Sequence, residues 1–104
     1  MIRKQEITTF EFPQNAVIWD VRDEKAYAEG HVKGAINQPI QNLTAESLTQ
    51  VASDQPIYIL CGGGSKAPRA AEQLEELDNS RDYVVLMGGT RAVRDAGIPL
   101  EQGS

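Results

Sequence analysis

The single cysteine of the chain is the residue whose type and position best suit chemistry. Cys61 follows a short apolar run and is followed by the glycines 62–64, Ser65 and Lys66. Pro68 comes two residues later, and proline favours the first turn of a helix. A thiolate is a nucleophile, and a nearby cation, free backbone N–H groups and a helix start all favour thiolate over thiol. The stretch therefore predicts a reactive cysteine.

The glycines predict a loop that binds an anion. Glycine lets the backbone curl so that successive N–H groups point inward. Because Pro68 disfavours helical geometry at Ala67, we expect the helix to begin at Pro68 and the loop to span Cys61 to Lys66. The alternative interpretation is a small buried thiol beside glycines that only mark a turn. The strand end, thiol, glycines, cation and helix start together favour the reactive interpretation.

Known phosphate-binding sequence patterns do not fully match the spacing of residues 61–67. A P-loop needs Gly-Lys-Ser/Thr, whereas the order here is Gly64-Ser65-Lys66. The dinucleotide pattern is met only in its looser form, with Ala67 in the last place, and the next strand closes without an acidic residue. A cysteine phosphatase needs Cys-x5-Arg, and Ala67 stands where the arginine would be. Phosphoryl transfer is therefore the weaker hypothesis, because no guanidinium is placed to clamp a phosphoryl group.

The elements that must position Cys61 alternate between strand and helix. We expect strands at 16–21, 57–60 and 83–87, and helices at 23–29, from 44 onward, at 68–77 and at 90–96. This alternation predicts an α/β fold, a mostly parallel sheet with helices on both faces. Ligands of such sheets bind beyond the carboxyl ends of the strands. Cys61 is the first residue after one of those ends.

Composition limits the class of protein. The 104 residues suit one domain, expected to span 1–104, with residues 103–104 a native tail or a cloning remnant. A net charge of −5 argues against a nucleic-acid partner, and no apolar run approaches the roughly 20 residues of a membrane helix. The N-terminus lacks the apolar run of a signal peptide, so we expect a cytoplasmic protein with a reduced thiol. One cysteine and one histidine make no metal site, and we expect no cofactor.

Four segments together resemble the single-domain rhodaneses, the thiosulfate sulfurtransferases. They are IWDVRDEKAYAEGHVKGAINQPI (18–40), IYILCGGGSKA (57–67), VVLMGG (84–89) and AGIPL (96–100). The resemblance covers nearly the whole chain. It implies a rhodanese-like fold of three layers, α/β/α, with a central, mostly parallel sheet of about five strands. It also implies a ping-pong reaction, in which Cys61 takes sulfane sulfur from thiosulfate or a similar donor and passes it to cyanide or a thiol. Because no second cysteine can resolve the persulfide on Cys61, the acceptor must come from outside, and a protein acceptor is an alternative to a small molecule.

The resemblance also implies a role for each residue of the loop. Cys61 takes the position of the sulfur-carrying cysteine. The substrate-binding positions are Gly62, Gly63, Gly64, Ser65, Lys66 and Ala67. A loop of this length resembles the sulfur-handling members, since relatives acting on phosphate have one residue more. The family often has Trp in the last helix, where this chain has Val93. Two other functions stay open: a module that relays persulfide for a partner protein, and a phosphatase or arsenate reductase on the same scaffold.

Residues outside the loop are expected to support the structure around the loop and not to take part in the chemistry. Asp20 and Arg22 leave the end of a strand and are expected to pair with each other or to brace the loop. His31 lies in a turn that resembles the family's structural Gly-His-x-x-Gly-Ala turn, so a structural role is favoured over a general base. Gly88-Gly89 is expected to form the turn before the last helix, with Thr90 as its cap.

Overall fold

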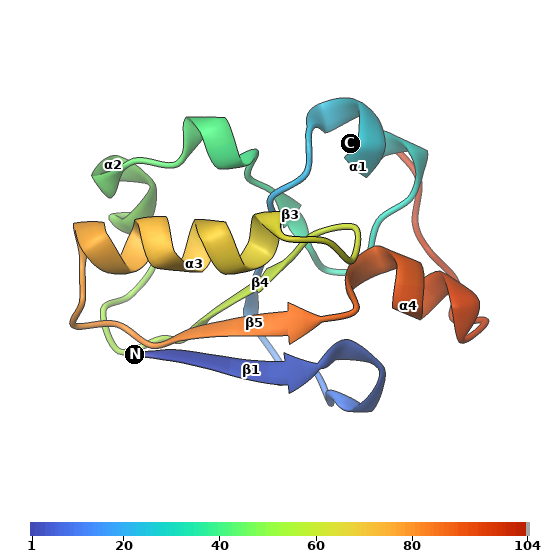
Figure 1. Ribbon diagram of the computed structural model, residues 1–104, viewed down its shortest axis with the longest axis horizontal. Coiled ribbons are helices and arrows are strands. Elements are labelled where there is room, and N and C mark those ends of the chain that lie inside the picture. Colours follow the sequence, from blue (N-terminus) through green and yellow to red (C-terminus); the bar gives the residue numbers. More distant parts are fainter. Residues whose placement is uncertain (104) are drawn as a thin grey trace.

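Five parallel strands form one sheet at the centre of the protein (Figure 1). The computed structural model describes residues 1–103. The strands are β1 (Ile2–Glu6), β2 (Val17–Asp20), β3 (Ile36–Asn37), β4 (Ile57–Leu60) and β5 (Tyr83–Met87), in the order β1-β5-β4-β2-β3. Every neighbouring pair of strands is parallel. Their carboxyl ends therefore meet at one edge, which β4 and β5 share at the centre of the sheet.

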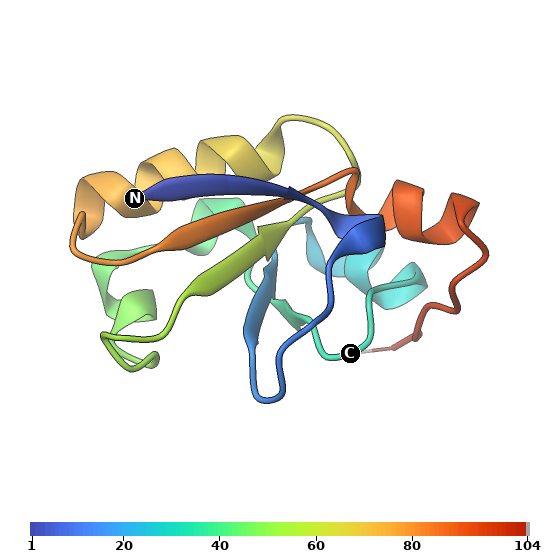
Figure 2. The same cartoon turned by 90° about the horizontal axis from the view of Figure 1, so that it is seen from below.

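Helices cover both faces of the sheet, as predicted (Figures 1 and 2). They are α1 (Glu24–Glu29), α2 (Ala45–Leu48), α3 (Lys66–Leu77) and α4 (Gly89–Asp95), with short 3-10 turns at Ile7–Thr9 and Ile40–Asn42. On one face, side chains of α2 and α3 pack against Trp19, Ile59 and Val85. On the other face, α1 and α4 pack through Tyr27 and Val93. The result is the expected three-layer α/β/α arrangement.

The buried strands match their predicted ranges closely, whereas the edge strands were not located. β4 and β5 have the predicted bounds, and β2 is one residue shorter at each end than the predicted 16–21. β1 gives little sequence signal, because four of its five residues are exposed and polar. Such an edge strand has no buried face to impose alternation. β3 has only two residues, which is too short for any periodicity.

The start of α3 corrects the sequence prediction. The helix begins at Lys66 and not at Pro68, so the loop spans Cys61 to Ser65. Pro68 lies at the third helical position, where the missing N–H would have had no partner inside the helix. Ala67 adopts the helical conformation before the proline and is 2% exposed. The restriction before proline is thus outweighed by burial of this small side chain against the core.

The start of α4 differs in a way that bears on the site. The predicted cap, Thr90, lies inside the helix, which runs from Gly89 to Asp95 after Gly88 as its N-cap. Gly88 has a φ of 92° and Gly89 a φ of 57°, a region that favours glycine. The helix therefore starts directly at the end of β5.

Local signals placed the two short helices correctly. Asp23 Oδ1 accepts the Ala26 N–H at 2.8 Å, which caps α1 at the start of the predicted range 23–29. The Thr44 N–H donates to Ser47 Oγ at 3.1 Å at the start of α2. No helix within residues 1–103 has the length and apolar character needed to cross a membrane. At the C-terminus, the Gly103 N–H donates to the Ala28 carbonyl at 2.9 Å, and Ser104 lies outside the described residues.

Candidate active site

Cys61 lies at the carboxyl end of β4, in the middle of the sheet. Its side chain packs on the face that α3 covers and is 4% exposed. Beside it is a cavity of about 20 Å³ between the loop, α3 and the end of β5. A cavity of this size holds about one water molecule. The thiol is therefore accessible only to a small group, or to one that enters as the loop moves.

The loop after Cys61 presents a run of unpaired backbone donors. None of the N–H groups of residues 62–67 donates a hydrogen bond to an atom of residues 1–103, and the first to do so is that of Arg69, to the Ser65 carbonyl at 3.2 Å. Gly63, Gly64 and Ser65 are exposed, so solvent can reach these donors. Successive N–H groups without partners, at a helix start, can bind an anion. The thiol and the free donors are thus adjacent.

One carbonyl of the loop faces the sulfur. Cys61 Sγ donates to the Gly64 carbonyl oxygen at 3.7 Å. A carbonyl stabilises the protonated thiol and not the thiolate, so this contact opposes the expectation that only N–H groups face the sulfur. A Cβ added at Gly64 would meet no atom within 4 Å, so the peptide after it has room to turn.

Asp20 and Arg22 form a buried ion pair next to the loop. Arg22 Nε lies 3.0 Å from Asp20 Oδ1, and Arg22 Nη2 lies 2.8 Å from Asp20 Oδ2. The same Nη2 donates to the Gly30 carbonyl at 2.8 Å, which ties the end of β2 to the end of α1. The Arg22 Cδ would lie 3.7 Å from a Cβ placed on Gly62. The pair therefore forms part of the wall against which the loop rests.

Sequence reasoning missed the contact between the loop and the start of α4. The Thr90 N–H and Thr90 Oγ1 both donate to the Cys61 carbonyl, at 2.9 Å and 3.4 Å. The Arg91 N–H donates to the Gly62 carbonyl at 3.2 Å. The sequence signal for this contact is the pair of glycines after the buried strand 83–87, which by itself indicates only a turn.

His31 contacts another part of the molecule. Its ring stacks on Tyr27 with centroids 3.8 Å apart, and its Nδ1 lies 2.9 Å from the Tyr27 carbonyl oxygen. Burial, together with the charges of Asp20 and Glu101, raises the pKa of Tyr27. The His31 N–H donates to the Glu101 carbonyl at 2.8 Å, which joins the end of α1 to the C-terminal segment. Within residues 1–103, no three His, Cys, Asp or Glu side chains come close enough together to hold a metal ion.

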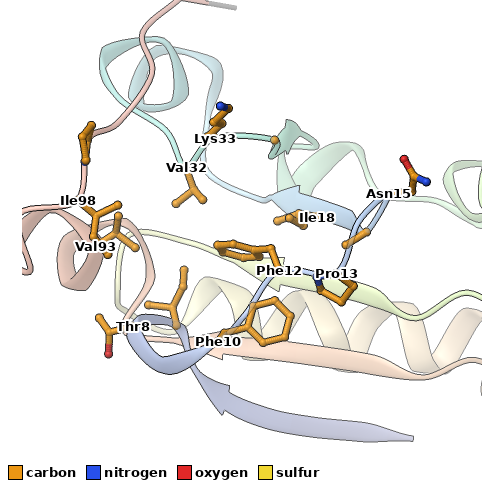
Figure 3. Close-up of a pocket in the computed structure, with 14 residues that line it drawn as sticks. Thr8, Phe10, Phe12, Pro13, Asn15, Ile18, Val32, Lys33, Val93 and Ile98 are labelled. Carbon is orange, nitrogen blue, oxygen red and sulfur yellow. The ribbon is translucent and has the colours of Figure 1, made fainter.

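A larger cavity of about 580 Å³ lies on the other face of the sheet (Figure 3). Apolar side chains from the segment before β2, from α4 and from the C-terminal segment line it, and among them Phe12, Ile18, Val93 and Ile98 lie around one space. No residue of the cysteine loop lines this cavity. Lys33 is at its margin, with its amino group turned away. The residues that line this cavity include no Cys, His, Asp or Glu, so the cysteine loop is the better candidate for chemistry.

Comparison with known proteins agrees with this fold. The family model of the rhodanese-like domain matches residues 9–96. The thiosulfate sulfurtransferase GlpE of Shewanella oneidensis is 34% identical over 79 residues, which cover 76% of this chain and 76% of that protein. An HTH-type transcriptional regulator of Mycobacterium tuberculosis is 36% identical over 87 residues, covering 82% of this chain and 37% of the regulator. A rhodanese-like domain protein from Staphylococcus aureus superposes with a TM-score of 0.76 at 27% identity, covering 98% of this chain and 99% of that one.

A parallel α/β sheet with a cysteine loop at its carboxyl edge defines the class of protein. The chain belongs to the rhodanese-like domain family. It spans 37% to 55% of the length of the first curated relatives that it matches.

Proposed function

We propose that this protein is a sulfurtransferase that carries sulfane sulfur as a persulfide on Cys61. The observation that carries the proposal is the position of a lone thiol beside six consecutive N–H groups that have no acceptor within residues 1–103. These are the N–H groups of residues 62–67, in the loop and the start of α3. Such a loop suits a dianionic donor such as thiosulfate, because N–H groups stabilise negative oxygen and sulfur. Similarity to proteins named thiosulfate sulfurtransferase supports this assignment.

The proposed reaction has two half-reactions. In the first, the Cys61 thiolate attacks the outer sulfur of thiosulfate, a new S–S bond forms, and sulfite leaves with the electron pair of the old one. In the second, cyanide or a thiolate attacks the outer sulfur of the persulfide, and Cys61 leaves as the thiolate. The chain has no second cysteine, so the acceptor comes from outside. For the thiolate to be favoured, the Gly64 carbonyl must turn away from the sulfur, and three consecutive glycines make such a turn possible.

Supporting residues have separate proposed roles. Lys66 is the first residue of α3, half-buried beside the loop, and supplies a positive charge near a bound donor. Asp20 and Arg22 brace the loop and do not touch the donor. Ser65 and Ala67 contribute their backbone N–H groups.

The length of the relatives favours one further candidate, a domain that relays persulfide for a partner. The match to a regulator covers only 37% of that protein, so the related domain also occurs attached to other segments. The proposed partners are then a sulfur donor and a protein acceptor. A phosphatase or arsenate reductase remains the weakest proposal, because Ala67, buried in α3, stands where a cysteine phosphatase has its arginine.

Steady-state formation of thiocyanate from thiosulfate and cyanide tests the proposal. The wild-type protein should turn over, and Cys61→Ser should not, because a hydroxyl is a poor nucleophile for sulfur and cannot store a persulfide. Thermal melting should show that Cys61→Ser remains folded. A relay domain would accept sulfur yet turn over poorly without its partner. Hydrolysis of an aryl phosphate without thiocyanate formation would overturn the assignment.

A further inference from the structure

The start of α4 is in backbone contact with the cysteine loop. A Cβ at Gly89 would overlap the Cys61 carbonyl oxygen and would lie 2.7 Å from the Gly63 nitrogen. A Cβ at Gly63 would in turn lie 3.0 Å from the Gly88 carbonyl oxygen. Side chains are thus excluded from both sides, and the two segments meet main chain against main chain.

This contact turns the first two carbonyls of the loop toward α4. The Cys61 carbonyl accepts the Thr90 N–H and the Thr90 hydroxyl, and the Gly62 carbonyl accepts the Arg91 N–H. In a trans peptide, the N–H of the next residue points opposite to the carbonyl. The N–H groups of Gly62 and Gly63 are therefore turned away from α4, and they stay without an acceptor in residues 1–103.

Gly64, the third glycine of the loop, has a carbonyl that receives no hydrogen bond from α4. The Gly64 carbonyl accepts no backbone hydrogen bond from residues 1–103, and it is the carbonyl that lies against Cys61 Sγ. Glycine peptides turn readily, since no Cβ limits their φ and ψ. Without the bonds from α4, the Cys61–Gly62 and Gly62–Gly63 peptides would turn more freely as well.

We infer that Thr90 is a positioning residue that keeps the loop in its anion-binding arrangement. Its side chain is 1% exposed, and within residues 1–103 the hydroxyl bonds to the Cys61 carbonyl. Thr90 fixes the orientation of the Cys61 carbonyl, and with it the orientation of the Gly62 N–H on the opposite side of the same peptide. This N–H therefore stays available to an anion that reaches the sulfur. The inference deepens the proposed function and rests on it for its biological meaning.

The test compares the alkylation of Cys61 by iodoacetate, which is anionic, with that by iodoacetamide, which is neutral. The ratio of the two rate constants measures how well the loop attracts an anion, whereas general damage to the thiol changes both rates. Thr90→Val removes the hydroxyl and nearly keeps the shape, and it should lower the ratio about three- to tenfold, the worth of one neutral hydrogen bond. Thr90→Ser keeps the hydroxyl and should retain the wild-type ratio.

One control and one additional variant make the result specific. Thr49→Val removes a hydroxyl that donates to the Glu46 carbonyl at 2.6 Å at the end of α2, and it should leave the ratio unchanged. Thr90→Ala is a second variant without the hydroxyl, for use if Thr90→Val does not fold. An unchanged ratio in the variants without the hydroxyl, or an equal loss in Thr90→Ser, would overturn the inference. Failure of thiosulfate to load sulfur onto the wild-type protein would overturn the proposed function instead and would leave the alkylation ratio interpretable.

Discussion

Lys66 is the one charged side chain between Cys61 and Ala67. It is half-buried at the first position of α3, where the helix dipole disfavours a cation by a few tenths to about 1 kcal/mol. Lys66→Ala should therefore leave the melting temperature unchanged or slightly higher. The same change should lower kcat/KM for thiosulfate about ten- to a hundredfold, because a charge-assisted contact is worth about 1.5–3 kcal/mol.

Lys25→Ala is the matched control, since it removes an equal charge from an exposed position of α1. The loss in Lys66→Ala should shrink as salt rises, because ions screen a charge that solvent can reach. An equal loss in both variants would mean that net charge alone matters. An unchanged kcat/KM in Lys66→Ala would assign donor binding to the backbone.

The pair of glycines at the start of α4 affects how this helix packs against the neighbouring strands. Gly89 has a φ of 57°, and a Cβ there would overlap the Cys61 carbonyl oxygen. Gly97, just after the same helix, has a φ of 78°, yet a Cβ there would meet no atom within 4 Å. Gly97→Ala should destabilise by about 1–2 kcal/mol, the cost of the left-handed conformation alone. Gly89→Ala should cost clearly more, since β4, β5 and α4 must also separate.

Urea unfolding of both variants measures this difference, with the alkylation rate of Cys61 as a second readout. Gly97→Ala should keep the wild-type alkylation rate, and Gly89→Ala should change it. Equal loss of stability in the two variants would show that the main-chain contact at Gly89 contributes nothing beyond its φ.

The elements also show how far sequence reasoning reaches. The strand 57–60 was predictable because a short apolar run before glycines is typical of a buried parallel strand. β1 was not, because its exposed residues carry no alternation and its position depends on pairing with β5. Cys61 could be singled out from residue type and spacing. The bonds from Thr90 could not, because they depend on how closely two segments 29 residues apart approach in space.

The stability of the whole molecule is expected to depend on pH through Tyr83. Tyr83 joins the sheet to the end of α3, and its hydroxyl contacts the carbonyl oxygens of Leu74 at 3.2 Å and Asp78 at 2.7 Å. Burial, and then the charge of Asp78, raises the pKa of Tyr83 to about 12. A free tyrosine has a pKa of about 10, so the folded state favours the neutral phenol. The contribution to stability is complete below about pH 10 and is lost as the pH rises toward about 12.

Thermal melting between about pH 9 and about pH 11.5 tests this coupling. The melting temperature of the wild-type protein should fall more steeply than that of Tyr83→Phe, which cannot ionise at this position. Tyr58→Phe, which removes a half-buried phenol on the other face, is the control and should keep the wild-type slope. Equal slopes in wild type and Tyr83→Phe would show that Tyr83 does not limit alkaline stability.

The mass of the intact protein after incubation with thiosulfate is the most direct test of the proposed persulfide. The wild-type chain should become one sulfur atom heavier, with the added atom on the peptide that contains Cys61, and cyanide or a thiol should remove it. Cys61→Ser should keep its original mass under the same conditions. A wild-type mass that does not change, or an equal gain in Cys61→Ser, would contradict sulfur transfer through Cys61.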